Sequence, residues 1–215
     1  MPFDDTKAWR QKRRQRILEA AAELFARNTY QAVQIDDVAH LAGTGKATVY
    51  RYFPSKQELY LEGFDQALGV LEDAVASAAI ASVPPPERLE AMLRTLFKTF
   101  AEQLPSLQVL GGDDSHLAER GRQVFRRRAA RIADRLRAVM DEGIATGRFR
   151  SVDTEVFARM LISMARGAAI ASAYTSHERA LDAVLDMTLR GGLAVNFAPP
   201  LSAESTAHKR WSTAR

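Results

Sequence analysis

The most informative chemistry lies within residues 34–59, where cations, hydroxyl groups and aromatic rings surround a few apolar residues. Val49 and Phe53 would bury one face of a short helix there. The opposite surface would then carry Lys46, Ala47, Thr48, Tyr50, Arg51 and Tyr52. These side chains offer hydrogen-bond donors, cations and one methyl group, which suits base edges in a DNA major groove and the neighbouring phosphates.

A second short helix must hold this surface in place. Gly43 stands where the preceding helix needs a left-handed residue to end. Ala39 is small enough to let the two helices approach closely. We expect the first helix to present an apolar face of Ile35, Val38 and Leu41. Two helices that share one apolar seam across a glycine turn predict a helix-turn-helix.

The motif itself resembles a known family signature. It runs Gly43-x-x-Lys46-x-Thr48-x-Tyr50-x-Tyr52-Phe53-x-Ser55-Lys56-x-x-Leu59 and is similar to the signature of TetR-family transcriptional regulators. With the upstream helix at residues 13–28, the resemblance covers the first third of the chain. It implies a DNA-binding head followed by a larger helical domain that binds a ligand and dimerises. Gln34 and Gly45 replace residues that are often Thr and Ser, and both changes weaken a helix N-cap.

Basic residues flank the motif on both sides. Residues 10–16 hold five cations and no acid, and Lys56 begins the helix that follows the motif. A charged helix end is often only solvated, but beside a helix-turn-helix we expect phosphate contacts. The predicted DNA surface is Arg13, Arg14, Gln34, Thr44, Lys46, Ala47, Thr48, Tyr50, Arg51, Tyr52 and Lys56.

Composition narrows the class of protein. The chain has 215 residues, a 47% hydrophobic content and no Cys, so disulfides, thiolate zinc sites and cysteine nucleophiles are excluded. A net charge of +4 fits an anionic partner. We find no apolar signal core and no run long enough to span a bilayer, so we expect a cytoplasmic protein. Four scattered His residues provide no ligand set, and we predict neither a metal nor a cofactor.

The helical periodicity predicts an all-α fold. We divide it into a helix-turn-helix head at 1–60, an effector-binding and dimerisation domain at 61–198, and a disordered tail at 199–215. A linker helix begins at the capping box Ser55-x-x-Glu58 and runs to about Ala81. Further helices are expected at 87–103, 117–142, 153–174 and 178–195.

The arginine-rich segment 117–142 has one apolar stripe, and Arg120, Arg127 and Arg131 lie away from it. We expect those three to form a solvated basic face. Arg122 and Arg128 lie near the stripe and could hold an acidic head group. Aromatic and Met residues are more often plain core, but the resemblance favours an effector pocket. Its candidates are Phe97, Phe100, Leu104, His116, Arg122, Phe125, Arg128, Phe157, Met160 and Met164.

The last two predicted helices are apolar on more than one face. They could be buried within one subunit, but the resemblance implies a four-helix dimer interface. Its expected residues are Gly167, Ala168, Ala171, Leu181, Val184, Leu185, Thr188 and Gly192.

Together these features predict a homodimeric, sequence-specific regulator of transcription. It would be a repressor that a small, largely apolar effector releases from a palindromic operator. Two alternatives remain open at this point. One is an all-helical enzyme, although no catalytic grouping is recognisable. The other is a non-specific nucleic-acid binder.

Overall fold

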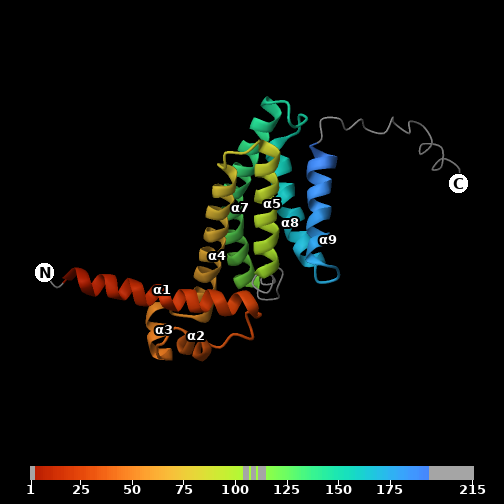
Figure 1. Cartoon of the computed structure of the whole chain (residues 1–215). Helices are drawn as coiled ribbons and strands as arrows, with labels where there is room; N and C mark the ends of the chain where they lie inside the picture. Colours follow the sequence, from red (N-terminus) through yellow and green to blue (C-terminus); the bar gives the residue numbers. More distant parts are fainter. Residues whose placement is uncertain (1–2, 104–106, 108–109, 111–114, 194–215) are drawn as a thin grey trace, which may run out of the picture.

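A computed structural model describes residues 3–103, 107, 110 and 115–193. This part of the chain is almost entirely helical and contains no strand, so the predicted all-α class is confirmed. Figure 1 shows a small head of three helices joined to a taller helical body. Within the described ranges, no helix combines the length and the apolar content that crossing a bilayer requires.

The head consists of α1 (Phe3–Arg27), α2 (Ile35–Leu41) and α3 (Lys46–Tyr52). Its core is formed by apolar side chains that are at most 3% exposed, namely Ile17, Ala21, Phe25, Val38, Val49 and Phe53. Gly43 has a φ of +61°, as its place after α2 predicts. Its N–H donates to the carbonyl of His40, which completes the turn into α3.

Three details of the head refine the sequence prediction. Leu41 is 48% exposed, so it does not belong to the α2–α3 seam, where Ala42 is buried instead. Neither Gln34 nor Gly45 caps its helix with a side chain, as expected. The helix α1 begins about ten residues earlier than predicted, at Phe3.

One long helix, α4 (Lys56–Ala79), connects the head to the body (Figure 1). The hydroxyl of Ser55 accepts a hydrogen bond from the N–H of Glu58 at 3.1 Å, which is the predicted N-terminal cap. One side of α4 packs against α1, and the rest packs against α5 (Pro85–Glu102) and α7 (Ser115–Ala145).

The body is completed by α8 (Thr154–Ala171) and α9 (His177–Leu185). The sequence predicts a single helix over 178–195, but its second half is a π-helical segment, η2 (Asp186–Gly192). The helix α8 packs against α5, α7 and α9, so it lies at the centre of the body. Leu104 and the predicted tail 199–215 lie outside the described residues.

Candidate nucleic-acid interface and ligand cavity

The outer surface of α3 carries the predicted donors and cations. Lys46, Ala47 and Arg51 are exposed, and the Tyr50 side chain is 43% exposed. Thr48 and Tyr52 are partly exposed, as is Thr44 in the turn before α3, while Gln34 is exposed before α2. Because Val49 and Phe53 hold the other face of this segment in the core, its polar groups point away from the head.

Lys46 has an acidic neighbour that the sequence prediction did not pair with it. Its Nζ donates to a carboxylate oxygen of Asp36 on α2 at 2.8 Å. This hydrogen bond and the charge of Asp36 raise the pKa of Lys46 above its ordinary value. Both side chains are more than half exposed, so an incoming phosphate can replace the carboxylate.

The flanking cations also have partners within the head. The Arg14 guanidinium lies 4.8 Å from the centre of the Phe53 ring and pairs with Glu62. Lys56 Nζ lies 4.6 Å from the centre of the Tyr30 ring and donates to the Gln31 carbonyl at 3.2 Å. Partial burial lowers the pKa of Lys56.

Arg13 and Arg16 lie on the same helix. The Arg13 guanidinium stacks over Trp9, 4.1 Å from the ring centre. Arg16, which the prediction passed over, donates to the carbonyl of Ala42 at 2.9 Å. It therefore stabilises the turn between α2 and α3. The one sequence signal for this residue was its position in the basic cluster of residues 10–16.

The basic face of α7 is not only solvated, because Arg120, Arg127 and Arg131 also form ion pairs, although Arg127 and Arg131 stay more than half exposed. Three acids of α4, each seven residues from the next, pair with it. We call this set the α4–α7 ladder, and it joins Glu58 to Arg120, Asp65 to Arg127 and Arg128, and Glu72 to Arg128 and Arg131.

Hydrogen bonds in the ladder are short and partly shielded from water. Arg128 donates twice to Asp65, at 2.8 and 2.9 Å, and once to Glu72 at 2.9 Å. Its side chain is only 21% exposed. The guanidinium of Arg128 holds the pKa of Asp65 below its ordinary value, with a smaller effect from Arg127. Arg120 lowers the pKa of Glu58 in the same way. The ladder therefore fixes the head-proximal half of α4 against the body.

These contacts remove Arg128 from the candidate effector pocket, because two carboxylates already neutralise it. Arg122 is also engaged, since it donates to the Leu110 carbonyl at 2.9 Å and pairs with Glu119 at 3.1 Å. Neither guanidinium stands unpaired at the edge of an apolar cavity. His116 is exposed at the start of α7, and Met160 is 49% exposed on α8, so neither lines an interior pocket.

The remaining aromatic candidates do come together between α5, α7 and α8. Phe97 and Phe100 are buried, and Phe125, Phe157 and Met164 are partly buried against the hydrophobic core to which both belong. The Phe100 and Phe125 ring centres are 6.3 Å apart. Phe97 also meets the ring of His177 edge to face, with 6.0 Å between ring centres.

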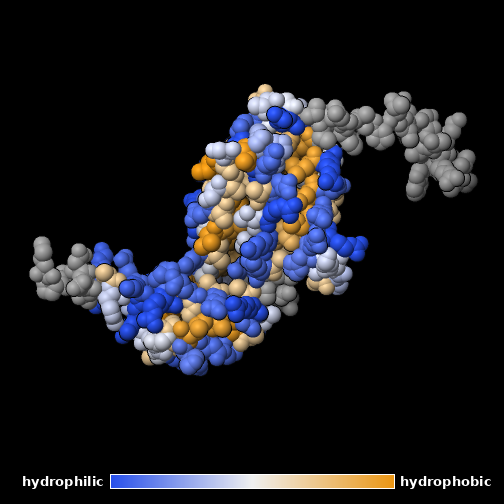
Figure 2. All heavy atoms as spheres, viewed as in Figure 1, coloured by the Kyte–Doolittle hydropathy of each residue, from blue (hydrophilic) through white to orange (hydrophobic). Residues whose placement is uncertain are grey.

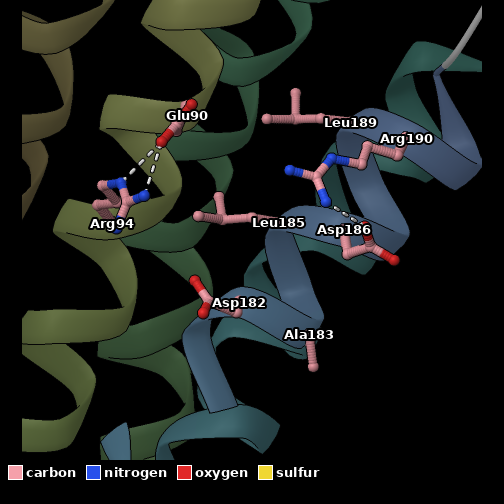
Figure 3. A pocket seen from close by; sticks show the side chains of 8 residues that line it. All are labelled: Glu90, Arg94, Asp182, Ala183, Leu185, Asp186, Leu189 and Arg190. Atoms are coloured by element: carbon pink, nitrogen blue, oxygen red, sulfur yellow. Dashed lines mark hydrogen bonds and ion pairs between the residues drawn. The ribbon is translucent and has the colours of Figure 1, made fainter. Parts of the chain in front are cut away.

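An open cavity of about 600 Å³ borders Phe97, between α5 and α9. Its apolar wall is formed by Phe97, Ala101 and Leu181, and charged side chains of both helices form its rim. A second cavity of about 530 Å³ continues along the same groove past Arg94, and Figure 3 shows its lining from Glu90 to Arg190. Figure 2 shows hydrophobic residues along this part of the body, with hydrophilic residues beside them.

A stripe of apolar side chains on α8 has no cover within the described part of the subunit. Val156, Met160 and Ile170 are about half exposed, and Met187 on η2 is 64% exposed. Among the predicted interface residues, Gly167 and Ala171 are exposed and Ala168 is partly exposed. In contrast, Val184, Leu185 and Thr188 are buried inside the subunit and Leu181 is partly buried, so they face the wrong way for that role. Gly192 is the last residue of η2, and its place in an interface stays a prediction.

Comparisons with known proteins agree with the two-part architecture. Residues 17–62 match the model described as "Bacterial regulatory proteins, tetR family", and residues 82–170 match "Tetracyclin repressor-like, C-terminal domain". The transcriptional repressor KstR2 of Rhodococcus jostii is 28% identical over 166 residues, which are 74% of this chain and 79% of the relative.

Two further proteins cover similar lengths. The regulator YhgD of Bacillus subtilis is 25% identical over 71% of this chain and 80% of its own. The crystal structure of the TetR-family regulator PfmR from Thermus thermophilus aligns with a TM-score of 0.61 and 28% identity. That alignment covers 81% of this chain and 97% of that structure. All three are regulators of transcription rather than enzymes.

Proposed function

Since the chain belongs to the tetR family of bacterial regulatory proteins and is a DNA-binding regulator of transcription, we propose that it is a ligand-released repressor. Two copies would bind a palindromic operator through their α3 helices. A small, largely apolar effector would bind the body and lower the affinity for DNA. The description of KstR2 as a repressor supports this direction of control. The head at 1–60 and the body at 61–198 would be the two functional units.

The observation that carries the proposal is the outer surface of α3. Tyr50 is 43% exposed and lies beside the exposed Lys46 and Arg51, while the opposite face is locked into the head core. A rigid helix that presents hydroxyl and cationic donors fits a major groove. Gln34, Thr44 and Lys56 border that surface and would contact the phosphates, as would Arg13 and Arg14.

Selection of bound duplexes from a random-sequence library tests this proposal directly. We expect one palindromic sequence to be enriched, because two-fold symmetry of the protein imposes it on the site.

Tyr50→Ala should weaken binding to that sequence by about 1–3 kcal/mol in fluorescence anisotropy, the range for a good base contact. Ile80→Ala, which changes an 80% exposed residue at the end of α4, should leave the affinity unchanged. Equal affinity for random duplexes would instead establish the non-specific binder.

The uncovered stripe on α8 supports the proposed dimer. A side chain added at Gly167 would meet no atom of its own subunit within 4 Å, so there is room for a second chain to approach closely. Val156, Met160 and Ile170 would supply apolar area around that point, joined by Met187 from η2. Gly167, Ala168 and Ala171 therefore remain proposed interface residues.

The groove between α5 and α9 supports the proposed effector site. Its cavity of about 600 Å³ lies within the usual range for small-molecule pockets, about 300–1,000 Å³. The apolar wall at Phe97, Ala101 and Leu181 favours an apolar molecule. Binding in the form of the dimer whose heads are badly spaced would shift the population away from DNA.

Thermal shift with decanol, decanoate and decylamine tests the apolar site, because a ligand that binds only the folded state raises Tm. We expect decanol to raise Tm, and Ala101→Trp to remove the increase by filling the cavity. Lys98→Ala on the rim is the matched control, and it should keep the response to decanol. No increase with any of the three compounds would count against an apolar effector.

A further inference from the structure

The first half of α1 extends beyond the folded head. Residues 7–12 are helical, yet each of them is exposed, and burial begins only at Ile17. Figure 1 shows this part of the helix projecting past α3. It also precedes the part of the chain that the family model matches, which begins at residue 17. Because Arg14 and Arg16 already contact the head, we call only residues 3–12 the N-terminal arm.

One face of α1 is apolar where the helix packs into the head, and the same face is basic further toward the N-terminus. With 3.6 residues per turn, Lys7, Arg10 and Arg14 fall within about 80° of the stripe formed by Ile17, Ala21 and Phe25. The apolar half of this stripe packs into the head core. Lys7 and Arg10 therefore face the same side of α1 as the head but lie beyond it, whereas Arg14 contacts the head.

A helix without tertiary contacts is marginal in water, because most helical stability in proteins comes from packing. Trp9 is 51% exposed, and its ring stacks with Arg13 of the same helix rather than with the head. The first turn of the helix contains Asp4 and Asp5, and from residue 7 to residue 18 the helix then has six cations and no acid. The exposed, basic first half of α1 therefore has the charge that favours binding to a polyanion.

We propose that the N-terminal arm binds the sugar-phosphate backbone outside the half-site that α3 reads, with Lys7 and Arg10 as the phosphate ligands. This inference rests on the proposed function, because it places the arm beside DNA already held by the head. The ten residues from Phe3 to Lys12 span about 15 Å at 1.5 Å per residue. At 3.4 Å per base pair the arm therefore reaches about four base pairs of flanking duplex rather than a full half-site.

The Lys7→Ala/Arg10→Ala variant tests the arm, since Ala keeps the helix propensity of both positions. The probe is the duplex that the library selection yields, extended by ten base pairs at each end. The parent should protect flanking sugars from hydroxyl radicals that the variant leaves open. The log–log salt dependence of binding should become shallower by about 0.9 for each phosphate that the variant no longer neutralises.

Arg135→Ala/Arg148→Ala is the matched control, because it removes the same charge from exposed positions in and after the second half of α7, far along the chain from Arg120, which pairs with Glu58 at the head end of α4. The control should keep the parent's footprint and salt slope. Identical footprints and slopes for the parent and the arm variant would overturn the inference, while specific binding by both would leave the proposed function standing. Failure of the library to yield any preferred duplex would instead overturn the proposed function.

Discussion

At the scale of single residues, Lys46 and Asp36 form an ion pair that DNA would have to open if Lys46 binds a phosphate as proposed. Their carboxylate and ammonium are 2.8 Å apart and well exposed, and the same ammonium is a proposed phosphate ligand. The carboxylate also adds a negative charge where DNA would bring phosphates. Asp36 therefore limits the affinity of the head for any duplex.

Asp36→Asn should tighten DNA binding. It frees Lys46 and removes a repelling charge, and exposed ion pairs contribute about 0.2–1 kcal/mol, so we expect Kd to fall up to about fivefold. Fluorescence anisotropy at low salt measures this change. Asp37→Asn, one position along on the same exposed helix start, is the control for charge alone. A weaker complex would mean that the pair positions Lys46 for DNA.

At the scale of elements, the α4–α7 ladder sets the strength of the connection between head and body. Asp65 has a lowered pKa because Arg128 stabilises its charged form. Its contribution to stability is thus complete above the unfolded pKa of about 3.9 and disappears as pH falls through the lower folded value.

Asp65→Asn should reduce the free energy of unfolding at pH 7 by about 1–3 kcal/mol, the range for hydrogen bonds to charged groups. The difference from the parent should shrink below about pH 4, because Asp65 then takes up a proton in the unfolded chain and, at still lower pH, in the folded protein. Urea unfolding at pH 7 and pH 3 measures both. Asp73→Asn, an exposed residue on α4, should change neither. A difference that stays constant with pH would rule out the charge of Asp65 as its origin.

Local features of these elements could be predicted from the sequence. The turn at Gly43 and the cap at Ser55 depend on neighbouring residues, so their residue types suffice to find them. The ladder could not be found in this way, because Asp65 and Arg128 are 63 positions apart and each helix alone looks solvated. The only indication was the seven-residue spacing of Glu58, Asp65 and Glu72, which Arg120 and Arg127 share.

The faces of α8 show a second limit. Apolar residues cover more than one side of this helix, so the sequence alone could not say which side is internal. It therefore predicts Met160 in the pocket, whereas Met160 lies on the surface at 49% exposure. It also predicts the residues of α9 at the interface, whereas they are buried against their own subunit, as Leu185 shows at 8% exposure.

At the scale of the whole molecule, the exposed stripe on α8 must be covered for the two heads to be held together. Ile170→Glu would place a charge in that apolar contact, and burying an unpaired charge is unfavourable. We expect sedimentation to show a monomer and DNA affinity to collapse, because each head then binds one half-site alone.

Two variants make this result interpretable. Ile80→Glu adds the same charge at an 80% exposed position and should leave the dimer intact. Leu185→Glu is a poor test of assembly, because Leu185 is buried in its own subunit and its replacement would unfold the body. An Ile170→Glu protein that sediments as a dimer would move the interface away from α8.

The length of α4 has a mechanical consequence. Its 24 residues form a rigid rod of about 36 Å, with the DNA-reading surface near one end and the body along the other. Because the ladder ties α4 to α7, the two helices would tilt together, and a tilt of about 5° about the far end would displace the near end of α4 by about 3 Å, close to the rise of one base pair. Such a lever converts a change of a fraction of an ångström beside the pivot into a misfit as large as one step of the operator.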